Sequence, residues 1–258
     1  DGDGDGDGEP EREIYKPGAD IGVQFWTTVT IISDDQPASG LDGFTPDVNN
    51  DVYDIAVQSK AADPADSLKE EKIILVGDFT SVNATSMNGI ARMTQTGLLD
   101  DGFDPGLGAN GYINSVKIAY ELEDLPGGIE TQLVAKPVIG GGFTSFNGSF
   151  RKGIARLNYD GSVDESFDPG DGVDGEVLDL FVQLDNRVIV AGDFVGVDGV
   201  PRNSIARLNA DGSLDEGFDI GEGPDGPIYV VKTLPDGRVI IAGDFLFVGD
   251  VFSPSIAV

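Results

Sequence analysis

The chain has 258 residues, enough for one large domain or two ordinary ones, and a formal net charge of −30 at pH 7. So acidic a surface repels nucleic acid and anionic membranes, and no apolar run approaches the roughly 20 residues that span a bilayer. Neither nucleic acid nor membrane insertion is therefore expected. The sequence has no Cys and no His, which excludes disulfides, thiolate metal sites and His-dependent catalysis of the Ser–His–Asp, Cys–His and HExxH types.

Residues 1–12 begin with four Asp-Gly pairs and cannot form a core, so we predict a flexible acidic arm. The alternative is a calcium-binding tract, in which Asp3, Asp5 and Asp7 supply alternate oxygen ligands as in the first half of an EF-hand loop. The Glu that ends such a loop and its flanking helices are not visible here. The acidic arm is therefore the favoured interpretation.

Residues 13–36 predict a β-hairpin with a second strand rich in β-branched and aromatic residues. The run PGADIGVQFWTTVTIISDD resembles the closing hairpin of a Calx-β domain, a calcium-binding module of surface proteins. Asp34 and Asp35, at its end, are further candidate calcium ligands. The alternative, which we favour, is that residues 27–32 form the first strand of the repeat array described next.

The pattern GDFVGVDGVPRNSIARLNADGSLDEGF, residues 192–218, recurs at 77–103 and 141–167 and begins again at 243. In the three full copies, 24 residues separate the Phe that follows Gly-Asp or Gly-Gly from the Phe that ends the copy. The interval to the next copy varies from 27 to 40 residues. One half of each unit is thus fixed, and the other half absorbs the insertions.

The variable half contains a turn between two apolar strands. In the short units this turn is residues 184–187 or 234–238, where Asp-Asn and Asp-Gly favour a tight hairpin. In the longer units it is replaced by residues 58–72 and 120–136. Equivalent positions of a repeat lie on the same side of the array, so both insertions are expected to project from one rim.

Three to four short strands in about 50 residues, without helical periodicity, are typical of a β-propeller blade. The order IARLNADGSLDEGFD, an apolar strand, a short turn and RVIIAGDF resembles the delta-60 repeat, a β-propeller family of large secreted and surface proteins of bacteria. The resemblance covers residues 41–258, and it implies a propeller without a catalytic motif. We predict that residues 37–258 form an all-β, propeller-like array of about four blades of 50–64 residues, incomplete or strand-exchanged at its ends.

Two sets of polar residues recur with the repeat. The Asp of GDF is predicted to form a hydrogen bond that stabilises each blade, either with the Arg of IAR or with the backbone, because polar groups in apolar strands need partners. The alternative is that these Asp residues ring a central channel and bind cations. The residues of this set are Asp78, Asp193, Asp244, Arg92, Arg156 and Arg207. The acids of the DGS and LDxxF segments are predicted to cap turns rather than to bind calcium; they are Asp100, Asp160, Asp164, Asp211 and Asp215.

The last copy contains only the start of the SIARL strand, and such an unpaired edge invites strand exchange within or between chains. The segment around Thr27 is the natural complement. The candidate strand-exchange residues are Thr27, Val29, Ile31, Ser255, Ile256 and Val258.

Together these features predict a non-catalytic structural or interaction module of a bacterial surface or extracellular assembly. Copies of itself or other surface proteins are the expected partners, and calcium is the one candidate cofactor. The alternative is a glycan- or cation-binding propeller that uses the rim with residues 58–72 and 120–136. A carboxylate-based hydrolase or lyase comes third, because the sequence shows no particular pair of carboxylates for it.

Overall fold

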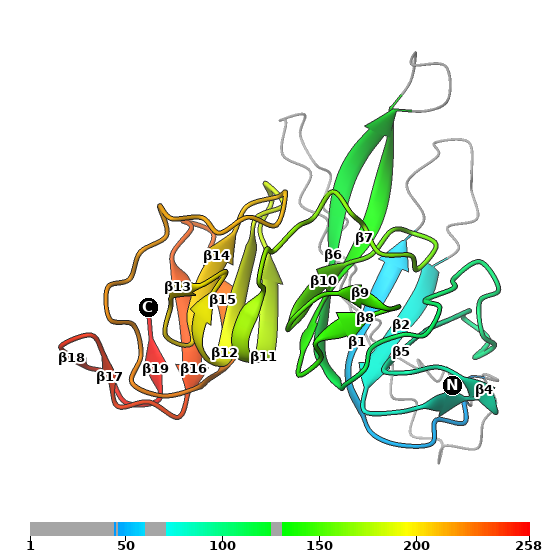
Figure 1. The fold of residues 1–258 in the computed structure, drawn as a ribbon, viewed down its shortest axis with the longest axis horizontal. Coiled ribbons are helices and arrows are strands. Elements are labelled where there is room, and N and C mark those ends of the chain that lie inside the picture. Colours follow the sequence, from blue (N-terminus) through cyan, green and yellow to red (C-terminus); the bar gives the residue numbers. More distant parts are fainter. Residues whose placement is uncertain (1–43, 45, 60–70, 125–130) are drawn as a thin grey trace, which may run out of the picture. The chain divides into compact units, whose positions relative to one another are not determined.

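The computed structural model describes residues 44, 46–59, 71–124 and 131–258. All of these belong to one compact unit, Pro37–Val258. Every regular element among them is a β-strand (Figure 1), and none of them forms a helix that could span a membrane. The predicted acidic arm and hairpin, residues 1–36, lie outside the described residues.

The described strands form seven antiparallel sheets, and the four larger ones follow one another along the chain; we call each of these four a blade. Blade 1 contains β1 (Val52–Ser59), β2 (Glu71–Gly77) and β5 (Ile90–Met93); blade 2 contains β6 (Ile113–Asp124), β7 (Thr131–Gly141) and β10 (Ile154–Arg156). Blade 3 contains β11 (Val173–Val182), β12 (Val188–Val197) and β14 (Ile205–Leu208); blade 4 contains β15 (Ile228–Thr233), β16 (Val239–Gly243) and β19 (Ile256–Ala257). This order confirms the predicted all-β, propeller-like array.

Each blade also carries a short hairpin between its second and third strands. These hairpins are β3 (Ser81–Val82) with β4 (Thr85–Ser86), β8 (Ser145–Phe146) with β9 (Ser149–Phe150), the end of β12 with β13 (Val200–Pro201), and β17 (Phe247–Val248) with β18 (Val251–Phe252). Cross-strand pairs in these hairpins fix which residues of different blades are equivalent.

A glycine before each hairpin allows the first two strands to approach closely. The register of β11 on β12 shifts between Val177 and Asp179, opposite Gly192. A Cβ on Gly192 would lie 2.0 Å from the backbone oxygen of Glu176, a distance no side chain tolerates. The Gly of the GDF pattern is therefore required by the bulge in the neighbouring strand.

The core lies between successive blades. On β12, Ile189 and Ala191 pack toward blade 4, whereas Val190 packs toward blade 2, as strand alternation dictates. The Phe that follows Gly-Asp or Gly-Gly packs in each of the three interfaces, and Phe143, Phe194 and Phe245 are at most 3% exposed. Neighbouring blades thus share their cores, and blade 1 has a further apolar cluster of its own around Phe79.

The two short turns form the predicted hairpins. Asn186 has φ +61° and Gly237 has φ +87°, the left-handed conformation that these residue types tolerate. The insertion at residues 120–136 is not an irregular loop, because it lengthens β6 and β7 into one long hairpin (Figure 1). Of residues 58–72, the described ends continue β1 and β2.

Candidate functional site

In blades 1 to 3, the arginine of the third strand binds a carboxylate eight residues later, and we call this pair the Arg–Asp joint. The Nε–Oδ2 distances are 2.7 Å for Arg92–Asp100, 2.7 Å for Arg156–Asp164 and 2.8 Å for Arg207–Asp215. A single β-bridge, such as Leu157 with Val163, folds the chain back so that the two side chains meet. The joint therefore depends on the turn between the third strand and the LDxxF segment.

This arrangement corrects the predicted pairing of the arginines with the Asp of GDF. Asp78, Asp193 and Asp244 are exposed, and no arginine of the described residues binds them. Arg207 lies opposite Ile189 on β12, and Asp193 is four residues farther along that strand, about 13 Å away at the rise of a β-strand. The two residues recur together because both belong to the repeat, not because they are in contact.

The joint also binds the next blade. Nη1 of Arg156 donates a hydrogen bond to the backbone oxygen of Ala210 at 2.8 Å, and Arg92 donates to the equivalent oxygen of Tyr159. The N–H of Asp168 donates to the oxygen of Asp211 at 2.7 Å, and blade 1 repeats this contact. The joints of blades 1 and 2 thus hold the turn of the following blade in place.

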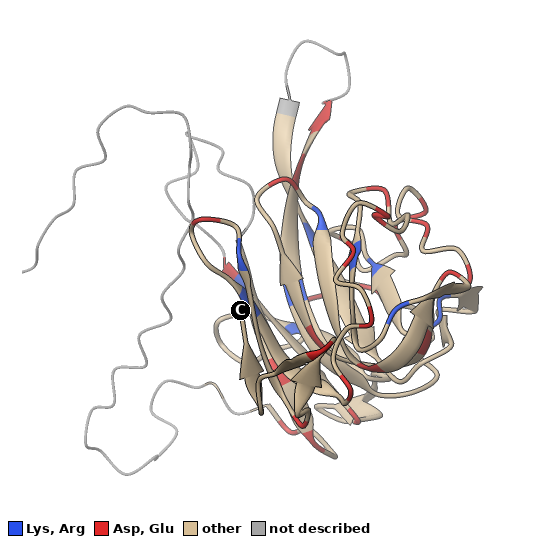
Figure 2. Cartoon of the chain, turned by 90° about the vertical axis from the view of Figure 1, so that its left-hand side faces the viewer, with Lys and Arg blue, Asp and Glu red and all other residues tan. Residues whose placement is uncertain are grey.

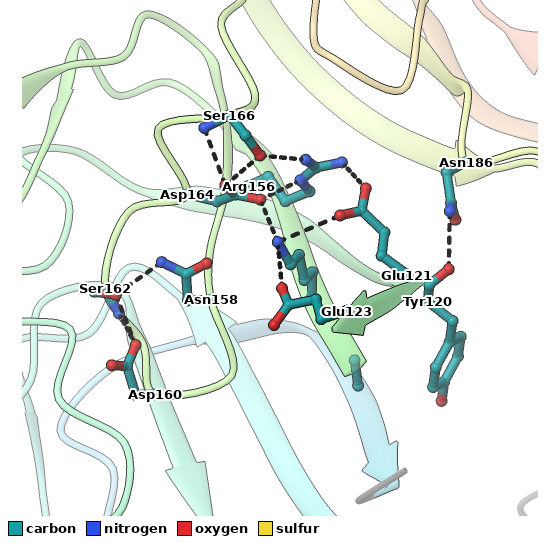
Figure 3. A network of polar contacts seen from close by, with 12 residues as sticks. Tyr120, Glu121, Glu123, Arg156, Asn158, Asp160, Ser162, Asp164, Ser166 and Asn186 are labelled. Carbon is teal, nitrogen blue, oxygen red and sulfur yellow. Dashed lines mark hydrogen bonds and ion pairs between the residues drawn. The ribbon is translucent and has the colours of Figure 1, made fainter. Parts of the chain in front are cut away.

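In blade 2 the joint is part of a larger network of charged side chains (Figure 3), in which Lys136, Arg156 and Asp164 are buried. Lys136 Nζ lies 3.1 Å from Asp164, 3.3 Å from Glu121 and 2.9 Å from Glu123, and Arg156 binds both Asp164 and Glu121. Both glutamates lie on the part of β6 contributed by the insertion at residues 120–136. In the described part of this rim, the charged side chains of the insertion therefore bind charged side chains of the same blade.

The network stabilises its ionised forms. Burial alone would raise the pKa of Asp164, but hydrogen bonds from Ser166 and Lys136 and the charge of Arg156 outweigh it and lower that pKa to about 2. Burial alone would lower the pKa of Lys136, but hydrogen bonds to Glu123 and Asp164 raise it. Asp164 is therefore ionised at neutral pH and cannot act there as a general acid.

The first strands of neighbouring blades contact one another, and two aspartates join their backbones. Asp54 Oδ2 accepts the N–H of Val116 in the next blade at 3.0 Å, and Asp179 Oδ2 accepts that of Val231 at 3.0 Å. Asp54 and Asp179 both follow the bulge of their strand, so their positions are equivalent. This shared position is the signal by which the sequence could have identified them.

Lysines at a second equivalent position neutralise these aspartates. Lys117 binds Asp54 and lies 3.4 Å from Asp179, and Lys232 also lies 3.4 Å from Asp179. The hydroxyl of Ser115 lies 3.1 Å from both carboxylates. The first strands of the blades thus carry a cluster of two lysines and two aspartates, whose charges balance. The Asp residues of the GDF pattern, which the alternative prediction placed around a channel, do not belong to this cluster.

One copy of the repeat has Gly142 in place of the Asp of GDF, and the structure shows why. A Cβ at Gly142 would lie 2.5 Å from Cζ of Tyr112, so the tyrosine ring occupies the space of that side chain. Burial raises the pKa of the Tyr112 hydroxyl, and the charge of Glu176 and the hydrogen bond between Tyr112 and Glu176 raise it further. Glu176 also accepts a hydrogen bond from Asn114 at 2.8 Å.

The acids of the DGS turns have the predicted capping role. Asp160 accepts the N–H and the hydroxyl of Ser162, and Asp211 does the same for Ser213. In the part of the chain that the structure describes, no group of three or more acidic side chains could hold a metal ion. The candidate calcium ligands, namely Asp3, Asp5, Asp7, Asp34 and Asp35, lie outside that part.

The hairpin of blade 4 is apolar where that of blade 1 is polar. Leu246, Phe247, Val251 and Phe252 are 55%, 40%, 66% and 65% exposed. The register of the two hairpins makes these residues equivalent to Thr80, Ser81, Thr85 and Ser86 of blade 1. Phe247 and Phe252 contact each other edge to face, with 5.4 Å between ring centroids. We call these four side chains the apolar hairpin.

The last strand lies in its own blade. Ile256 and Ala257 pair with Ala242 and Ile241 of β16, and the N–H of Ser255 donates to the backbone oxygen of Phe245. Ile256 is nonetheless 59% exposed, and Val258 is 69% exposed. The proposed complement, Thr27, Val29 and Ile31, lies outside the described residues, so strand exchange stays a prediction.

Four segments of the chain match a family model described as "Domain of unknown function (DUF5122) beta-propeller". The matched residues are 72–103, 136–167, 183–218 and 234–257. The first three segments each run from the second strand of a blade to the Phe after its Arg–Asp joint, so the match follows the repeat unit. Neither curated proteins nor solved structures gave a match. The chain is similar to this β-propeller family over all four blades.

Proposed function

We propose that this β-propeller domain is a non-catalytic structural and interaction module of a bacterial surface or extracellular assembly, and that it contacts another copy of itself through the apolar hairpin. The exposure of the four hairpin side chains carries the proposal. Contiguous exposed apolar surface typically marks an interaction site. Because the equivalent side chains of blade 1 are Thr and Ser, the repeat's own fold does not require apolar residues here.

The apolar hairpin offers a second copy a contact that avoids most of the chain's negative charge. Two chains with a formal charge of −30 each repel one another over most of their surface. Asp and Glu are spread over the turns and strand ends, as Figure 2 shows. Of residues 246–252, only Asp250 in the turn is charged, so two copies bring few carboxylates together there. Salt screens the remaining repulsion, so the association should strengthen as the ionic strength rises.

Sedimentation velocity over a range of protein concentrations tests the proposal. The test variant combines Leu246→Thr, Phe247→Ser, Val251→Thr and Phe252→Ser, which gives blade 4 the hairpin of blade 1. It is expected to fold, because Asp225 anchors the hairpin by accepting the backbone N–H groups of Leu246 and Phe247, at 2.8 and 3.0 Å. We expect the wild type to associate as concentration and salt increase and the variant to stay monomeric.

Phe150→Ser is the matched control, since Phe150 is 58% exposed in the hairpin of blade 2 at the position equivalent to Phe252. This control should associate like the wild type. A wild type that stays monomeric at every concentration, or a hairpin variant that associates equally well, would contradict the proposal.

A further inference from the structure

The first strands of blades 1 to 3 converge near their bulges. The hydroxyl of Ser115 in blade 2 lies 3.1 Å from the carboxylates of both Asp54 in blade 1 and Asp179 in blade 3. Lys117 in blade 2 likewise contacts both aspartates. The residues just before these aspartates therefore lie close together as well, although they come from blades 1 and 3.

Two tyrosines and three carboxylates gather at this point, and we call them the tyrosine–carboxylate site. Partial burial raises the pKa of the Tyr53 hydroxyl, and the charges of Asp78, Asp51 and Glu176 raise it further. Glu176 also forms a hydrogen bond with Tyr112. The carboxylate of blade 3 thus lies near the tyrosines of both blade 1 and blade 2.

The residues of this site differ between blades, unlike those on which the fold depends. The register of the first two strands makes Asp51, Tyr112, Glu176 and Pro227 equivalent. Each of them precedes the partner of a Gly that all four blades have in the second strand. Blade 2 has Gly142 where the other blades have Asp, and the Tyr112 ring occupies the space. The repeat's own fold therefore does not require a tyrosine or a carboxylate at this position.

The carboxylates of this site lack a positive partner. Lys117 binds the neighbouring Asp54, but no lysine or arginine among the described residues binds Asp51, Asp78 or Glu176. Like charges held together repel one another, and a bound positive group relieves that repulsion. Charge complementarity therefore favours a cationic ligand.

The tyrosine rings favour an organic cation over a metal ion. Tyr53 is 47% exposed, so its ring is open to a ligand. The face of an aromatic ring attracts an ammonium group, and the apolar body of the ring packs against an aliphatic chain. A calcium or magnesium ion is held by oxygen ligands, and a ring face offers none.

We propose that the tyrosine–carboxylate site binds an ammonium group at the end of an aliphatic chain. The ammonium group lies among the carboxylates of Asp51, Asp78 and Glu176, and the methylene groups of the chain pack against the Tyr53 ring. A free alkylamine and a lysine side chain both supply this chemistry. The site lies in blades 1 to 3, apart from the apolar hairpin of blade 4, and it goes beyond the proposed self-association.

Titration of the full chain with n-butylammonium chloride, followed by amide NMR at constant ionic strength, tests the proposal. We expect saturable shifts of the amide signals of Tyr53 and Glu176. Neither n-butanol, which lacks the charge, nor sodium chloride should cause them. Nα-acetyl-lysine amide distinguishes the two sources of the ammonium group: an affinity at least equal to that of n-butylammonium indicates a lysine side chain, and a weaker one indicates a free amine.

Substitutions with matched controls locate the site. Tyr53→Ala and Glu176→Gln should each weaken the affinity about fivefold, through loss of a cation–π contact or of one charge. Tyr229→Ala is the control for the first, since Tyr229 is 53% exposed at the same bulge position in blade 4. Asp244→Asn is the control for the second, since Asp244 is exposed in blade 4, and both controls should bind like the wild type. No saturable shift with n-butylammonium, equal shifts with n-butanol, or an equal loss from Tyr229→Ala would overturn the proposal and leave the proposed self-association untouched.

Discussion

Replacing Asp164 with Asn tests the buried Arg–Asp joint most sharply. The Asp164 side chain is 6% exposed and binds Arg156 at 2.7 Å and Lys136 at 3.1 Å. Its pKa falls from 3.8 to about 2 in the folded chain, which corresponds to about 2 kcal/mol of stability at about 1.36 kcal/mol per pKa unit. Loss of one partner of a fully buried pair typically costs about 3–5 kcal/mol, and here Glu121 still binds Arg156 and Lys136. We therefore expect Asp164→Asn to lower the free energy of unfolding at pH 7 by about 2–3 kcal/mol.

The pH dependence has a defined sign. The pKa of Asp164 is lower in the folded chain than in the unfolded chain, so its contribution is complete above the unfolded value and is lost as the pH falls toward 2. The asparagine variant has no such contribution at any pH. The difference in stability between wild type and variant should therefore be constant from pH 7 to about pH 5 and shrink between about pH 4 and pH 2.

Urea unfolding followed by circular dichroism gives the free energies at each pH. Asp193→Asn is the matched control, since Asp193 is exposed and belongs to the same repeat; its effect should stay within about 0.5 kcal/mol. Three results would refute the reasoning: a neutral Asp164→Asn, an equally large loss from Asp193→Asn, or a gap that widens on acidification.

Two further changes test the contacts between blades. Gly142→Asp should destabilise the chain by about 1–3 kcal/mol, because the new side chain meets the ring of Tyr112. Tyr112→Ala in the same chain should restore part of the lost stability. A melting temperature that Gly142→Asp leaves unchanged would contradict this prediction. Lys117→Met should lower the free energy of unfolding in urea by about 1–2 kcal/mol, because Asp54 and Asp179 then lose a cation that binds both. A stability equal to that of the wild type would show that the ion pairs of Lys117 contribute nothing.

The repeat made the blades predictable from the sequence. Its fixed interval located the strands, and the residues at 184–187 and 234–238 identified the hairpin turns, because Asn186 and Gly237 suit the backbone that those turns require. The insertion at 120–136 was harder to predict. Its residues gave no sign that Leu122 pairs with Leu133 across two lengthened strands.

The polar contacts were less predictable because recurrence does not reveal distance. Asp193 and Arg207 recur together yet lie at different levels of the blade, while Asp215 reaches the arginine only because the chain folds back after β14. The ion pair of Lys117 and Asp54 joins residues that are 63 positions apart, and the packing of neighbouring blades brings them together. No local pattern encodes such a contact.

Amide hydrogen exchange of the wild type at low and high protein concentration tests most directly whether blade 4 is the contact surface. We predict that the backbone of β17 and β18 gains protection as concentration rises, while that of β14, which blade 4 already covers, stays unchanged. Protection of β17 and β18 that does not depend on concentration, or a gain confined to other blades, would contradict the account.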